Sequence, residues 1–221
     1  MSSSFVRFAV LLCLPAAAFA QGSFEGVVTA KMSSLKGAGN VATYSIKGEA
    51  LRMDMTSATG ASVTMLVDKP HSLNVMLMHQ QHMVMDLSAM GMPRPGAKNE
   101  TKSLASMTSL GKKETIAGRE CEHMLVTTEK DEQIDVCLAK GMGSFVMGSA
   151  MGGRGTGGDV APEALSRLGG DAFPLKVVDV TRGKTVFLVT KIEKKPLDDS
   201  LFTIPAGYQK IDMGRLGRPG L

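Results

Sequence analysis

Along most of the chain, hydrophobic and polar residues alternate with the two-residue period of a β-strand. In the segment 51–56, Leu51, Met53 and Met55 point to one side and the intervening polar residues point to the other. The segment 133–138 repeats this alternation. Because one side of each segment is apolar and the other is polar, the pattern predicts an antiparallel sheet with one buried face, not a parallel sheet buried on both faces.

Glycine, proline, asparagine and serine residues divide the chain into short segments of this kind. We predict strands at Phe24–Met32, Val41–Lys47, Leu51–Thr56, Ser62–Asp68, Ser72–Met78, His82–Leu87, Glu114–Ala117, Cys121–Thr127, Gln133–Ala139, Leu175–Thr181 and Thr185–Lys191. We found no internal repeat. The pattern therefore predicts a mostly β chain with one domain over residues 21–213.

Two long connections interrupt the strands. Residues 141–158 are rich in glycine, and Pro93 and Pro95 exclude a central strand from the stretch at about 90–109. We predict that both are mobile loops. A helix is predicted at Asp159–Leu168, where Asp159 is the N-cap and two glycines follow the last turn.

The first twenty residues are typical of a secretory signal. Arg7 precedes the apolar run Phe8–Leu14, and Ala18-Phe19-Ala20 fits a small-x-small cleavage site. We therefore predict a signal peptide at 1–20, an exported protein and no transmembrane segment. Loss of Arg7 lowers the formal net charge from +4 to +3. Because this excess is small and dispersed, we expect no nucleic-acid partner, and we interpret residues 214–221 as a flexible tail.

Two cysteines, Cys121 and Cys137, remain after the predicted cleavage. In an exported protein such a pair predicts a disulfide, and a turn at Thr128–Lys130 would place the two cysteines directly opposite each other on neighbouring strands. A loop of about 16 residues closed in this way is worth roughly 3 kcal/mol. The alternative is a redox-active pair, although the close Cys-x-x-Cys spacing of thiol exchangers is absent.

Methionine is concentrated in one part of the chain. Of 17 methionines, nine fall between positions 53 and 92, and eight of these form Met-x-Met pairs. If His79 to His82 form the turn of a hairpin, Met78 pairs with Met83 and Met76 with Met85, so that four thioethers share one face.

Three interpretations of this methionine face remain open. The first is an adaptable apolar surface that binds a lipid-like ligand. Its predicted residues are Met53, Met55, Met65, Met76, Met78, Met83 and Met85. The second is a copper(I) or silver(I) site, since thioethers and imidazoles suit soft ions. Its predicted ligands are Met76, Met78, His79, His82, Met83 and Met85. In the third, an envelope structural protein without a small ligand, methionine fills the core of a chain that has no tryptophan.

Catalytic motifs are not evident. Ser149 directly follows Gly148 instead of lying midway between Gly148 and Gly152, as a nucleophile elbow requires, and the glycines at 152–155 lack the lysine of a phosphate loop. His71 and His123 have no sequence neighbour that suggests a catalytic pair. We therefore expect a non-enzymatic protein that needs no cofactor.

Three groups of segments together resemble a bacterial exported family known only as a domain of unknown function. They are Tyr44–Met55 (YSIKGEALRMDM) with Met65–Asp68 (MLVD), Lys113–Glu122 (KETIAGRECE), and Ile192–Phe202 (IEKKPLDDSLF) with Ile204–Tyr208 (IPAGY). This family is similar to the LolA/LolB class of periplasmic lipoprotein carriers. The resemblance implies a strongly curved antiparallel sheet, an incomplete half-barrel with one or two short helices. It also favours a periplasmic location, but it does not carry a binding site over to this chain. The lipid or lipoprotein ligand that we expect is therefore a prediction from the methionine face.

Overall fold

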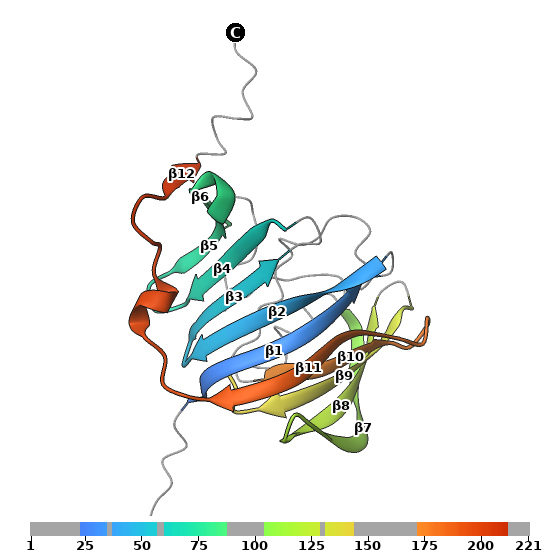
Figure 1. The fold of residues 1–221 in the computed structure, drawn as a ribbon. Helices are drawn as coiled ribbons and strands as arrows, with labels where there is room; N and C mark the ends of the chain where they lie inside the picture. The colour runs from blue at the N-terminus through green and yellow to red at the C-terminus, as the bar shows by residue number, and fades with distance from the viewer. Residues whose placement is uncertain are drawn as a thin grey trace, which may run out of the picture.

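The computed structural model describes residues 23–34, 37–56, 60–87, 104–128, 131–143 and 172–211. They form a single sheet of 12 strands that curves strongly and is drawn in Figure 1. The strands are β1 (Glu25–Ser34), β2 (Gly37–Lys47), β3 (Ala50–Thr56), β4 (Ser62–Asp68), β5 (Leu73–Met78), β6 (Met83–Asp86), β7 (Leu104–Ile116), β8 (Arg119–Thr128), β9 (Gln133–Lys140), β10 (Ala172–Asp179), β11 (Lys184–Lys194) and β12 (Gln209–Ile211).

The strand order along the sheet is β12-β6-β5-β4-β3-β2-β1-β11-β10-β9-β8-β7. Every neighbouring pair is antiparallel except β12 and β6, which are parallel. The sheet begins at β12 and ends at β7, so it does not close into a barrel. The strand register shifts at Thr29/Ala30, Pro174/Lys176 and Ser109/Lys113, and bulges of this kind bend strands and increase their twist. The predicted half-barrel is confirmed.

The predicted strands are all present, and β7 is the main correction. It begins at Leu104, inside the stretch predicted as a loop, and not at Glu114. Its residues 106 to 115 are mostly exposed on both sides, so they show no hydrophobic alternation. β7 is a strand because it pairs with β8 at the end of the sheet. The sequence also gave no sign of β12, which has only three residues.

Several predicted segments lie outside the described residues. These are the signal peptide, the part of the first loop up to residue 103, most of the second loop, the helix Asp159–Leu168, the pair Met90 and Met92, and the tail. Within the described residues, the helical elements are two 3-10 turns, η1 (His79–Gln81) and η4 (Asp199–Phe202).

The main core lies on the concave face of the sheet, around Tyr44. The Tyr44 ring on β2 meets Phe173 of β10 edge-on, with 5.6 Å between centroids, and Phe187 of β11 at 6.2 Å. Since β1 and β11 separate β2 from β10, a flat sheet would place these strands roughly 14 Å apart. The curvature therefore folds the face onto itself. Burial in this core raises the pKa of the Tyr44 phenol.

The prediction of one polar face is wrong for β4, β5 and β6. Their outer side carries a second apolar cluster. Its buried members are Leu66, Val75, Leu77 and Val84, with Leu73, Ile204 and Tyr208 packed against them. The last two belong to the segment after β11, in which η4 contacts β3 and β4 while β12 pairs with β6 (Figure 1). This C-terminal segment covers the second apolar cluster on the outer side of the sheet.

Candidate functional site

The seven predicted methionines lie in two adjacent rows that run across the strands. In the first row, Tyr44 pairs with Met53, Met53 with Met65, Met65 with Met76, and Met76 with Met85. In-register partners in a sheet project their side chains to the same face. The first row therefore continues the concave core from Tyr44 outwards.

The second row lies two residues away from the first on each strand. Ala42 pairs with Met55, Met55 with Val63, Val63 with Met78, and Met78 with Met83. Both rows end at β12, where Gln209 pairs with Met83 and Ile211 with Met85. We call these seven side chains, Met53, Met55, Met65, Met76, Met78, Met83 and Met85, the methionine face.

The predicted hairpin register is present, with Met76 opposite Met85 and Met78 opposite Met83. The connection is the turn η1 followed by His82, whose backbone is left-handed at φ 51°. Glutamine is a poor residue for a two-residue hairpin turn. The four-residue connection from His79 to His82 keeps the pairing of the methionines, and its left-handed residue is His82 instead of a glutamine.

Burial changes along the rows. Met53, Met55 and Met65 are buried, with exposed fractions of 2%, 7% and 4%. Met76, Met78, Met83 and Met85 on β5 and β6 are only half-buried. The methionine face is therefore core at β3 and β4 and becomes an accessible thioether surface at β5 and β6.

The structure does not bring His79 together with the thioethers. Thr64 donates to Asp54, so its hydroxyl oxygen accepts from Nε2 of His79 at 2.6 Å, and the Tyr208 hydroxyl donates to Nδ1 of the same ring. Asp54 alternates with Met53 and Met55 along β3, so this chain of hydrogen bonds lies on the outer side of the sheet. Both nitrogens of His79 are used there.

His82, the other predicted imidazole ligand, is exposed. Its ring lies against Tyr208, with 5.7 Å between the centroids. Tyr208 packs on the outer apolar cluster, so His82 also faces away from the methionine rows. The sulfur atoms predicted as metal ligands therefore lie on the concave face of the sheet. The two imidazoles predicted as ligands lie against Tyr208 on its outer side.

A second constellation, missed at the sequence level, surrounds His123. This side chain is buried at 2% exposure and lies between two carboxylates, with Nδ1 2.7 Å from Asp135 and Nε2 3.1 Å from Glu114. Lys176 approaches the two Glu114 oxygens at 3.1 and 3.0 Å. Its hydrogen bond to Glu114 holds the pKa of that carboxyl below its usual value, against the opposing effect of desolvation.

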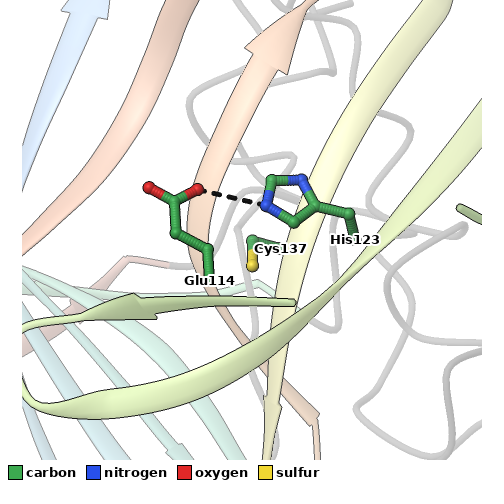
Figure 2. Close-up of side chains that lie close together, drawn as sticks. All are labelled: Glu114, His123 and Cys137. Atoms are coloured by element: carbon green, nitrogen blue, oxygen red, sulfur yellow. Dashed lines mark hydrogen bonds and ion pairs between the residues drawn. The ribbon is translucent and has the colours of Figure 1, made fainter. Parts of the chain in front are cut away.

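The predicted disulfide is confirmed and borders this constellation. The Cys121 and Cys137 sulfurs are 2.06 Å apart, with 5.3 Å between Cα atoms. Direct opposition was wrong, however, because Cys137 pairs with His123. The connection between β8 and β9 is longer than the predicted three residues and shifts the register. Figure 2 shows Glu114, His123 and Cys137, whose donor atoms lie within 4.8 Å of one another.

A turn in the sequence could have revealed this cluster. Ala117 and Gly118 both have positive φ, 50° and 79°, as a two-residue type I′ hairpin turn requires. That turn pairs Ile116 with Arg119, and hence Glu114 with Cys121. Since Cys121 and His123 share a strand face, Glu114 lies within reach of both.

The model of a family described as a domain of unknown function (DUF4412) matches residues 24–208. The resemblance seen in the sequence to a domain-of-unknown-function family is confirmed by this match. No curated protein gives a significant match to the chain.

Three solved structures illustrate the similar folds. PNGF-II is 12% identical with a TM-score of 0.46, and the match covers 86% of this chain and 32% of that one. The MucA/MucB complex of Pseudomonas aeruginosa is 16% identical with a TM-score of 0.42, and the match covers 81% of this chain and 54% of that one. A LolA superfamily protein from Nitrosomonas europaea, NE2245, is 12% identical with a TM-score of 0.33, and the match covers 84% of this chain and 91% of that one. The chain thus spans about a third of PNGF-II and about half of the MucB chain.

Among the described residues, no helix has the length and apolar character needed to cross a membrane.

Proposed function

The chain belongs to the DUF4412 family, and we propose that it is a non-enzymatic periplasmic binding or carrier protein that holds a lipid-like or acylated ligand against its methionine face. The observation that carries this proposal is the change in burial along the two rows. Three buried methionines form a continuous apolar floor with the core, and four half-buried ones extend it to an accessible surface.

The side chains of this surface suit an irregular apolar ligand. Methionine is unbranched and has three rotatable bonds, so a cluster of methionines can adapt to chains of different shape. Met76, Met78, Met83 and Met85 lie on a two-stranded hairpin, opposite each other in pairs. An acyl chain laid along this hairpin would contact four thioethers at once and continue onto Met65 on β4.

The composition of the rows supports an uncharged binding portion. From β2 to β6 they contain only tyrosine, methionine, alanine and valine. The nearby charged pair, Arg52 and Asp54, alternates with Met53 on the opposite face of β3. Burying a charged headgroup on this face would leave it without a partner from the rows, and that is costly. We therefore assign the acyl portion of the ligand to the methionine face.

Two features support the periplasmic part of the proposal. Residues 1–20 have the pattern that is typical of a signal peptide. The Cys121–Cys137 disulfide is typical of exported proteins, because disulfides persist in oxidising compartments.

Displacement of a fluorescent acyl probe tests the proposal. We expect the mature chain to bind the probe and to release it when a long-chain fatty acid or phospholipid is added. The double variant Met78→Gln/Met83→Gln places two amides on the surface while sparing the buried floor. Each amide should cost about 1.4 kcal/mol in contact with an acyl chain, or roughly tenfold in affinity.

The matched control is Met107→Gln. Met107 is also half-buried and packs against the core, but it lies on β7 at the other end of the strand order. It should leave the affinity for the probe within about twofold, because surface changes away from a site have small effects. Failure of the wild-type chain to bind any acyl probe, or equal losses in the double variant and the control, would overturn the proposal.

A further inference from the structure

We propose that reduction of the Cys121–Cys137 disulfide opens a binding site for a thiophilic divalent cation such as Zn²⁺. The ligands would be the two cysteine thiolates, Nε2 of His123 and one oxygen of Glu114. This inference is independent of the proposed function, since it uses other residues and another face of the sheet.

The donor atoms are already gathered. Those of Glu114, His123 and Cys137 lie within 4.8 Å of one another, and the Cys121 sulfur is bonded to that of Cys137. Figure 2 shows the three side chains close together. In a tetrahedral zinc site with bonds of 2.0 to 2.3 Å, neighbouring ligand atoms are about 3.5 Å apart. The three donors therefore need to close by roughly 1 Å, which side-chain rotation can supply. Breaking the disulfide allows the fourth donor to separate to the same spacing.

Asp135 supplies the support that a histidine ligand requires. Histidines that bind metal through one nitrogen almost always donate the other N–H to a carboxylate or carbonyl. Here Nδ1 of His123 lies 2.7 Å from Asp135, which leaves Nε2 directed at Glu114 and the sulfur atoms. His123 is 2% exposed, so its ring is held in this orientation. The oxidised structure thus already positions the imidazole for a cation.

The charges also balance. Lys176 lies 3.1 Å from Oε1 and 3.0 Å from Oε2 of Glu114, so it can keep its contact with Oε1 when Oε2 binds the cation. Asp135, whose side chain is 21% exposed, keeps its charge in contact with solvent, whereas the three negative charges of the two thiolates and the Glu114 carboxylate are neutralised by a divalent cation and the Lys176 ammonium. Such neutrality matters at a site with a buried imidazole, because an uncompensated charge there is costly.

The site lies on the opposite face from the methionines. Phe187, which contacts Tyr44, pairs with Val177, and Val177 pairs with Val136. Cys137 follows Val136 and therefore points to the other side, as does its partner His123. Loss of metal binding would leave the methionine face intact, so the two proposals fail separately.

The redox step has a defined balance. A dithiol reductant donates two electrons and two protons to the Cys121–Cys137 bond. Two thiols form on the protein, and the reductant closes to its own disulfide. Zn²⁺ then binds the two sulfurs as thiolates and takes the place of the Nε2 proton that joins His123 to Glu114, and the displaced protons go to solvent. In the oxidised state the sulfurs are bonded to each other and cannot serve as thiolate ligands.

Cobalt(II) is the probe for the experiment, because its complexes with thiolates absorb light and it replaces zinc in tetrahedral sites. The mature chain is reduced with a water-soluble phosphine, desalted without oxygen and titrated with Co²⁺ alone. We expect a thiolate-to-cobalt charge-transfer band and tetrahedral d–d bands that saturate at one equivalent per chain. Zn²⁺ should then abolish both, and the oxidised chain should show neither.

Two variants and one control locate the ligands. His123→Asn removes the imidazole and should weaken binding at least tenfold. Asp135→Asn should keep the charge-transfer band but weaken binding about 10- to 100-fold, the usual effect of losing a supporting carboxylate. His71→Asn changes a largely exposed histidine and should have no effect.

Circular dichroism, recorded alongside, shows whether the reduced chain stays folded. If reduction unfolds the chain, one equivalent of cobalt should restore the sheet signal. The proposal is overturned if the reduced chain gives no charge-transfer band with cobalt, or if reduction unfolds the chain and cobalt does not restore the sheet signal. It is also overturned if the oxidised chain binds cobalt equally well, or if His123→Asn binds it as tightly as the wild type.

Discussion

Replacing single methionines with alanine should separate the core end of the methionine face from its binding end. Met53 is 2% exposed and pairs with Tyr44 and Met65, so Met53→Ala removes a fully packed side chain. Such truncations cost 2–5 kcal/mol, and we expect about 3 kcal/mol here. Met83 is half-buried and pairs with Met78 and the exposed Gln209, so Met83→Ala should cost about 1 kcal/mol.

Urea unfolding with the disulfide intact measures both changes, and thermal unfolding provides a second value. At roughly 2–4 °C per kcal/mol for a chain of this size, Met53→Ala should lower Tm by about 6–12 °C and Met83→Ala by about 2–4 °C. Acyl-probe affinity should show the opposite order, with Met83→Ala the more damaging. Equal losses of stability would mean that Met83 is ordinary core, and the proposed surface would not exist.

Three other variants test the surroundings. Lys176 lowers the pKa of Glu114, so ionised Glu114 stabilises the fold above its unfolded pKa of about 4.3, and this contribution is lost as pH falls through the lowered pKa. As pH falls from 6 into the acid range, the free energy of unfolding measured in urea should therefore decrease less for Glu114→Gln than for the wild type. An equal decrease in both proteins would contradict a stabilising Glu114–Lys176 contact. A double cysteine-to-alanine variant should lose about 3 kcal/mol of unfolding free energy, given the 16-residue separation, and a loss under 1 kcal/mol would argue against the disulfide as a staple. Tyr208→Phe removes the hydroxyl that donates to His79 and should cost about 1 kcal/mol while speeding hydrogen exchange in β12, where unchanged exchange would show that this contact does not anchor the strand.

The sequence predicted the strands and the hairpin register because these depend on local patterns. Alternation along β3 and β9 reflects one buried face, and the methionine pairing on β5 and β6 follows from the length of the connection at His79 to His82. The disulfide was predictable from cysteine count and export alone. Each of these inferences needs only residues close in sequence or a known constraint on a pair.

What the sequence did not reveal depends on distant partners. β7 lacks alternation because it is an exposed end strand, and β12 is defined only by its pairing with β6. His79 is held on the outer face by a hydrogen bond to Tyr208, which lies 129 positions away in the sequence. The His123 cluster unites β7, β8, β9 and β10, and Lys176 lies 62 positions from Glu114. No local period encodes such contacts.

Photocrosslinking tests the central claim most directly. A fatty acid that carries a diazirine on its acyl chain is bound to the mature protein, irradiated and mapped by peptide mass spectrometry. We predict adducts concentrated on the hairpin of β5 and β6, from Leu73 to Asp86, and suppressed by excess unlabelled lipid. Adducts spread evenly over the chain, confined to β7–β9, or unaffected by the competitor would contradict binding at the methionine face.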